Sequence, residues 1–82
     1  MRLDKYLKVS RLIKRRTVAN EACDNGLVQV NGRPQRASYE VKEGDRLTLA
    51  FGAHTLTVEV VAVNETAARA DAAALYREIE RT

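Results

Sequence analysis

An α+β fold is predicted for this chain, with two short helices, then a small antiparallel sheet, then a third helix. Three features of the sequence indicate it. Apolar residues recur at helical spacing over residues 2–25, alternate with polar residues over residues 27–60, and return to helical spacing over residues 66–81. The 82 residues, of which 45% are hydrophobic, suffice for one small core, so we expect a single globular unit.

The first predicted helix spans residues 2–13. Residues three and four apart give it an apolar side: Leu3, Tyr6, Leu7 and Ile13. The other side carries a row of bases at intervals of three: Arg2, Lys5, Lys8, Arg11 and Lys14. Because three residues fall short of a helical turn of about 3.6 residues, this row winds slowly around the helix.

The second predicted helix follows a short connection and ends near Asn25. Thr17 is the expected N-cap, because its hydroxyl can accept a hydrogen bond from an unpaired backbone N–H. Gly26 suits the left-handed position just past the end of the helix. The predicted buried face consists of Val18, Ala19, Ala22 and Cys23. Two helices joined this tightly must pack at a steep angle.

About four strands are expected in the sheet. The dipeptide Asn31-Gly32 predicts a hairpin, and Pro34 restricts the returning strand to a sheet edge. A further turn is expected around Gly44. Alternation in the later strands predicts two sets of inward residues: Leu47, Leu49 and Phe51, then Leu56, Val58 and Val60.

The last predicted element is a helix over residues 66–81 that closes the sheet. The segment is rich in alanine, the best helix former. Its apolar residues lie at helical spacing: Ala68, Ala72, Leu75, Tyr76 and Ile79.

The charge of the chain is concentrated at one end. The formal net charge is +3, yet residues 1–16 contain seven Lys or Arg and one acid, whereas residues 17–82 contain seven bases and ten acids. Such a segregated basic segment indicates a polyanionic partner.

Lys14, Arg15 and Arg16 crowd the predicted N-terminus of the second helix. Unpaired N–H groups give that end positive partial charge, so three cations there are unfavourable unless an anion binds, and a phosphate would serve. The candidate RNA-binding residues are Arg2, Lys5, Lys8, Arg11, Lys14, Arg15, Arg16 and Thr17. The alternative is an ordinary solvated face, but the cluster and the charge asymmetry together favour RNA or DNA.

Catalysis and metal binding find little support, and we expect a protein that is not an enzyme and uses no cofactor or metal. Cys23 lies on a predicted buried face, where inert packing is the more common role, and His54 has no metal-ligating neighbour. Asp4, the one acid in the basic segment, is expected to stabilise the first helical turn or to pair with a neighbouring arginine. Asn31 and Gly32 are interpreted as turn residues rather than base readers.

A single cysteine cannot form a disulfide within the chain, which fits a reducing compartment. The first residues carry charges throughout and lack the apolar core of a signal peptide. We therefore expect a cytoplasmic protein.

The first half to two-thirds of the chain resembles the S4-type RNA-binding domain, an α+β fold with an alpha-L motif. The resemblance is carried by an RLD opening at residues 2–4, by Arg16 with Ala19 three places on, by the hairpin of residues 26–32, and by the turn of residues 41–45. It implies an S4-like RNA-binding domain over residues 1–63, with residues 64–82 as a helix packed on it. Asn20 departs from the family, in which a basic residue is common at this place.

Among S4-type families, the chain is similar to the small stand-alone RqcP (YabO) proteins in its run LDKYLKVSRLIKRRT and its tail motif AAALY. This resemblance implies a role in bacterial ribosome-associated quality control. The implied partners are 23S rRNA of the large subunit, peptidyl-tRNA and RqcH, with which alanine tailing of stalled chains is supported. It also implies that Arg2 and Arg16 are principal RNA contacts and that the free protein is a monomer.

Two other functions stay open at this point. One is general rRNA binding in heat stress or ribosome assembly, as in the related heat-shock proteins. The other is a protein-interaction adaptor that uses the sheet or the C-terminal segment.

Overall fold

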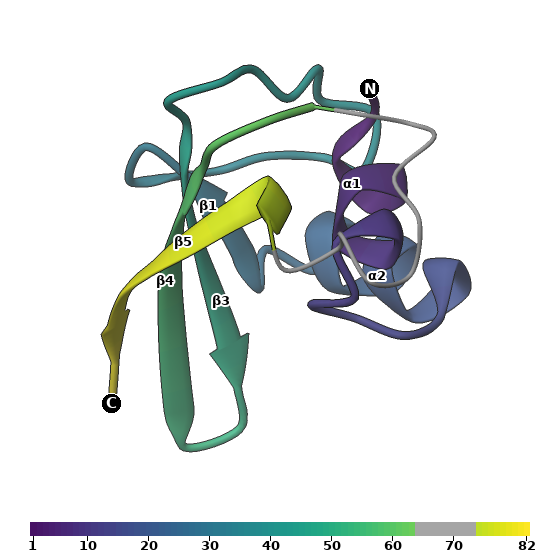
Figure 1. Ribbon diagram of the computed structural model, residues 1–82. Coiled ribbons are helices and arrows are strands. Elements are labelled where there is room, and N and C mark those ends of the chain that lie inside the picture. Colours follow the sequence, from purple (N-terminus) through teal and green to yellow (C-terminus); the bar gives the residue numbers. More distant parts are fainter. Residues whose placement is uncertain (64–73) are drawn as a thin grey trace.

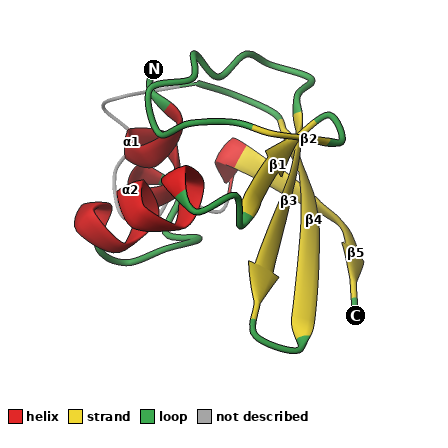
Figure 2. Ribbon diagram, turned by 180° about the vertical axis from the view of Figure 1, so that it is seen from behind, coloured by secondary structure: helices red, strands yellow, loops and turns green. Residues whose placement is uncertain are grey.

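Figure 1 shows a computed structural model of the chain, which describes residues 1–63 and 74–82. Two helices stand beside one antiparallel sheet, and Figure 2 shows from behind that both helices lie on the same side of the strands. The helices are α1 (Leu3–Val9) and α2 (Arg16–Asp24). The strands are β1 (Val28–Val30), β2 (Arg33–Pro34), β3 (Arg46–Phe51), β4 (His54–Val60) and β5 (Tyr76–Arg81).

α1 is shorter than the predicted helix over residues 2–13. Ser10 is its C-cap, and Arg11 has a left-handed backbone with φ of 65°, which ends the helix and turns the chain. The amide of Ile13 donates to the carbonyl of Leu7 at 3.0 Å, which ties the connection to the last turn. Arg11 and Lys14 therefore lie outside the helix, and the predicted row of bases is helical only at Lys5 and Lys8.

α2 begins earlier than predicted, so the assignment of Thr17 as its N-cap is wrong. Arg15 occupies the N-cap in an extended conformation without a side-chain cap, and Thr17 lies in the first turn. The carbonyl of Arg15 accepts the amide of Ala19 at 3.0 Å, which starts the helical hydrogen bonds. Because buried Ile13 fixes the chain just before this point, the helix can begin without help from a hydroxyl.

The end of α2 confirms the prediction for Gly26. This glycine has φ of 76°, and its amide donates to the carbonyl of Cys23 at 3.0 Å. The next amide, of Leu27, donates to the carbonyl of Ala22 at 2.9 Å. These two bonds form a Schellman motif, in which a left-handed glycine satisfies the last helical carbonyls.

Within residues 1–63 and 74–82 the sheet has five strands in the order β2-β1-β3-β4-β5, where about four were predicted. The hairpin at Asn31-Gly32 is confirmed: φ is 53° and 86° at the two positions, and Val30 pairs with Arg33. Positive φ at both central residues matches the twist of flanking strands. Pro34 lies on the edge strand β2, as predicted, where its missing N–H does not break a ladder.

One hydrophobic core lies between the sheet and the helices. α1 contributes its fully buried face, α2 contributes Ala19 and Cys23, and the sheet contributes Leu47, Leu49, Leu56, Val58 and Val60. Two predicted core residues are exposed instead. Phe51 lies at the end of β3 next to the turn to β4, and Val18 lies on the side of α2 away from the core.

The predicted C-terminal helix is wrong where the structure describes it, because residues 76–81 form β5, antiparallel to β4. The part of that prediction at residues 66–73 lies outside the described residues. β4 needs a partner for its outer backbone groups, and this pairing outweighs the helix propensity of the tail. Leu75 precedes the strand; its buried carbonyl accepts the hydroxyl of Tyr6 at 2.7 Å, which joins the tail to α1.

Candidate nucleic-acid interface

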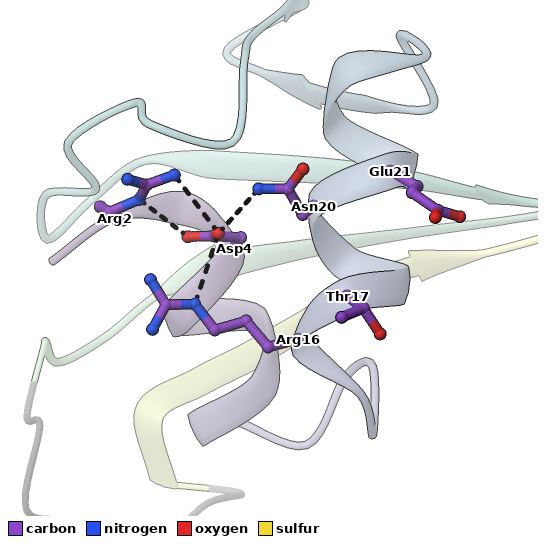
Figure 3. A pocket seen from close by; sticks show the side chains of 6 residues that line it. All are labelled: Arg2, Asp4, Arg16, Thr17, Asn20 and Glu21. Atoms are coloured by element: carbon purple, nitrogen blue, oxygen red, sulfur yellow. Dashed lines mark hydrogen bonds and ion pairs between the residues drawn. The ribbon is translucent and has the colours of Figure 1, made fainter.

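The two helices meet at the carboxylate of Asp4, which lies between two arginines (Figure 3). Arg2, the residue just before α1, donates from Nε to Oδ1 of Asp4 at 3.2 Å and from Nη2 to Oδ2 at 3.5 Å. Arg16, the first residue of α2, donates from Nε to Oδ2 at 3.4 Å. Residues 14 positions apart in the sequence are thus joined through one acid. We call Arg2, Asp4, Arg16 and Asn20 the Asp4 cluster.

Asp4 is one of the most buried polar side chains in the described chain, with a relative exposure of 2%. Two further donors complete its shell: the amide of Lys5 at 2.8 Å and Nδ2 of Asn20 at 3.2 Å. Burial raises the pKa of Asp4, but hydrogen bonds from Asn20, Arg16 and the Lys5 amide outweigh this and place the pKa below 3.8, its ordinary value. The carboxylate is therefore charged at neutral pH.

The arginines themselves face solvent. Their side chains are 50% exposed at Arg2 and 46% exposed at Arg16, while the carboxylate between them is covered. They border a shallow groove of about 450 Å³, which is also lined by Asp4, Thr17, Asn20 and Glu21. Such a groove, with guanidinium groups at its border, suits a phosphate, because a planar guanidinium presents several N–H donors.

The other predicted residues lie near the Asp4 cluster in sequence but not within its groove. Lys5 and Lys8 are on α1, and Lys8 is exposed in its last turn. Exposed Arg11, Lys14 and Arg15 belong to the connection between the helices. Of the eight candidate residues, the structure brings Arg2, Arg16 and Thr17 to one groove. The remaining cations extend the basic surface along α1 and the connection.

Asn20 is the member of the cluster that sequence reasoning missed. Its amide donates to the same carboxylate oxygen as Arg16. A signal was present, because residues 16 and 20 are four apart and share one helix face. Asp4 itself pairs with neighbouring Arg2, as predicted, and through Arg16 also with the second helix.

A second buried acid organises the hairpin. Asp45 accepts hydrogen bonds from Nδ2 of Asn31 at 3.1 Å, from the hydroxyl of Tyr39 at 3.1 Å and from the amide of Lys42 at 3.0 Å. Oδ1 of Asn31 accepts the amide of Arg46 at 3.0 Å. We call Asn31, Tyr39, Lys42 and Asp45 the Asp45 network. The structure gives Asn31 the turn role that the sequence indicates.

Cys23 is buried against the core, with 2% relative exposure. Burial raises the pKa of its thiol to about 12, and the negative charges of Asp4 and Asp24 act in the same direction. A thiol in this state is a poor nucleophile at neutral pH.

No group of three or more His, Cys, Asp or Glu side chains within residues 1–63 and 74–82 could bind a metal ion. Neither α1 nor α2 is long and apolar enough to cross a membrane, and the same holds for any helix in that part of the chain.

Comparison with protein families matches residues 1–47 to the S4 domain. The chain is 54% identical over 76 residues to a protein of Halalkalibacterium halodurans named RQC P-site tRNA stabilizing factor, covering 93% of this chain and 86% of that protein. A Bacillus subtilis protein of the same name is 51% identical, covering 93% and 88%.

Heat-shock relatives are also similar. Heat shock protein 15 of Escherichia coli is 38% identical over 95% of this chain, which spans 59% of that protein. The structure of heat shock protein 15 from Vibrio cholerae, described as trimeric, matches with a TM-score of 0.88 and 31% identity. The match covers 96% of this chain and 81% of that one.

Proposed function

Because this chain belongs to the S4 domain family, and within it to the RQC P-site tRNA stabilizing factors, we propose that it stabilises P-site tRNA during bacterial ribosome-associated quality control. In this proposal it is a cytoplasmic, non-catalytic factor that binds 23S rRNA of the large subunit and peptidyl-tRNA. Its action supports alanine tailing of stalled chains with RqcH.

The observation that carries the proposal is the pair of half-exposed arginines at the junction of the two helices. Charged, planar donors at a groove are the chemistry that binds phosphate. Arg2 and Arg16 supply the central contacts, and Thr17 at the same groove can donate its hydroxyl. We propose that Lys5, Lys8, Arg11, Lys14 and Arg15 follow the backbone on either side.

The mechanism is electrostatic and geometric. Near the P site, rRNA and tRNA backbones repel each other, because both are polyanions. A basic helix pair between them neutralises charge on both sides and releases counterions from each. The bound factor therefore raises the free energy required for peptidyl-tRNA to leave, without any chemical step.

A binding experiment with matched arginine variants tests this function. Large subunits that retain peptidyl-tRNA are sedimented with wild-type protein, Arg2→Ala, Arg16→Ala or Arg77→Ala. Arg77 lies on β5, at the opposite edge of the sheet from β2, and pairs with Glu59, so its variant makes the same charge change outside the Asp4 cluster. We expect each of the first two variants to bind about tenfold more weakly, the loss of roughly one charge-assisted contact. Equal losses in all three variants would contradict the proposal.

The similarity to heat shock protein 15 supports a second function, general binding of large-subunit rRNA under stress. The two functions differ in what they require of the subunit. For P-site stabilisation, subunits that hold peptidyl-tRNA should recruit the protein in preference to empty ones. Equal recruitment by both would favour the general function.

We also propose that the free protein is a monomer, unlike the trimer described for the Vibrio relative. Sedimentation velocity at micromolar concentration measures this directly. A concentration-dependent species of three chains would overturn this part of the proposal.

A further inference from the structure

An acid at the centre of an RNA-binding surface presents a conflict. Asp4 is ionised, and a carboxylate repels the phosphate that its neighbours are proposed to bind. If charge alone governed binding, loss of this carboxylate should strengthen it. The structure indicates the opposite, because of how the carboxylate contacts the two arginines.

Both guanidinium groups turn the same edge towards Asp4. Nε of Arg2 and Nε of Arg16 each donate to the carboxylate, and only Arg2 adds a longer bond through Nη2. In Figure 3 both outer nitrogens of Arg16 extend away from Asp4, whereas one outer nitrogen of Arg2 is joined to it and the other is not. The carboxylate thus accepts from both Nε atoms, and it leaves both outer nitrogens of Arg16 and one of Arg2 without a bond to Asp4.

We propose that Asp4 is a positioning residue: it orients the side chains of Arg2 and Arg16 so that both contact the phosphate backbone of RNA. This inference rests on the proposed RNA binding and adds to it how the arginines are oriented. Asn20 and the Lys5 amide fix Asp4 itself, through hydrogen bonds of 3.2 and 2.8 Å. The buried acid is therefore fixed, while the two arginine side chains stay accessible to solvent.

Such positioning strengthens binding because the side chains lose less conformational entropy when RNA binds. An exposed arginine loses rotamer freedom when it binds a phosphate, and an arginine already oriented loses less. With two arginines affected, we expect Asp4→Asn to weaken RNA binding by a factor of about ten, since immobilising each side chain costs about 0.5–1.5 kcal/mol. Asparagine keeps the size of the side chain and one acceptor, but its NH₂ cannot accept from the arginines.

Glu21 provides the matched control. It lines the same groove and is exposed, and neither arginine bonds to it within the described residues. Glu21→Gln therefore removes a negative charge near the proposed phosphate without disturbing the side chains of Arg2 and Arg16. Electrostatics predicts about twofold tighter binding for this variant. If affinity falls in Asp4→Asn and rises in Glu21→Gln, the effect of Asp4 is positioning of the arginines and not charge alone.

The experiment measures affinity for large subunits that carry peptidyl-tRNA, at a temperature where circular dichroism shows every variant folded. We expect Asp4→Asn to bind about tenfold more weakly than wild type, and to cause no further loss in a chain that already carries Arg2→Ala and Arg16→Ala. Tighter binding by Asp4→Asn would overturn the positioning role. An equal loss of affinity when Asp4→Asn is added to the chain that carries Arg2→Ala and Arg16→Ala would also overturn it. If Arg2→Ala and Arg16→Ala both bind large subunits as tightly as wild type, the proposed function itself fails.

Arg16→Lys gives an answer even if Asp4→Asn does not fold. Lysine keeps the positive charge at an exposed position but has no fork that can contact Asp4 and phosphate together. We expect severalfold weaker binding despite the unchanged charge. Wild-type affinity of Arg16→Lys would overturn the proposal.

Discussion

Replacement of Asp45 by alanine should destabilise the fold strongly, because three donors depend on this one carboxylate. Asn31, Tyr39 and Lys42 each donate to it at 3.0–3.1 Å, and Asp45 is only 8% exposed. A hydrogen bond to a charged group contributes about 1.5–3 kcal/mol when buried. Since the donors can bind water after the change, we use about 1 kcal/mol for each, or about 3 kcal/mol in total.

This loss is a large share of the stability that the domain can have. A chain of 82 residues has a free energy of unfolding of about 4–12 kcal/mol. Urea denaturation followed by circular dichroism measures the difference. Asp45→Asn, which keeps one acceptor, should cost roughly half as much. Glu43→Ala, an exposed neighbouring acid, should change stability by no more than about 0.5 kcal/mol.

A loss below about 1 kcal/mol for Asp45→Ala would refute this reasoning, because the threshold equals a single net hydrogen bond. The same variant should bind RNA normally once folded.

Three further predictions concern the core and the Asp4 cluster. Tyr6→Phe should lower the free energy of unfolding by about 1 kcal/mol in urea denaturation, since it removes the buried hydrogen bond to the Leu75 carbonyl; no change would show that this bond does not anchor the tail. Cys23 should react with a thiol reagent only as fast as the native protein opens, because its thiol is buried with a pKa of about 12; labelling at the rate of a free thiol would contradict this. Because the folded pKa of Asp4 lies below 3.8, its contribution to stability is present above that pH and is lost as the pH falls through the folded pKa. Asp4→Asn should therefore reduce the acid sensitivity of thermal unfolding below about pH 4, and an unchanged profile would refute the assignment.

Local features of the fold could be predicted from the sequence, and a non-local feature could not. Asn31-Gly32 and Gly26 require positive φ, a property of the residues themselves, so both turns occur where predicted. Residues 76–81 instead pair with β4, which lies about twenty residues away in sequence. Helix propensity carries no information on such a partner.

The candidate site shows the same division. The concentration of bases before residue 17 is evident in the sequence, and it predicts that the candidate site lies on the helix pair. The meeting of Arg2 with Arg16 could not follow from spacing along a helix, because α1 ends at Val9. It depends on Asp4 from one helix and on Asn20 from the other, and thus on how the helices pack.

The most direct test of the central claim is the salt dependence of binding to large subunits that carry peptidyl-tRNA. If the cations of the helix pair contact phosphates, the logarithm of affinity should fall linearly with the logarithm of potassium chloride concentration. Arg16→Ala should reduce the magnitude of that slope by about one, and Arg77→Ala should leave it unchanged. An affinity that stays constant across salt concentrations, or a slope that Arg16→Ala does not alter, would contradict the claim.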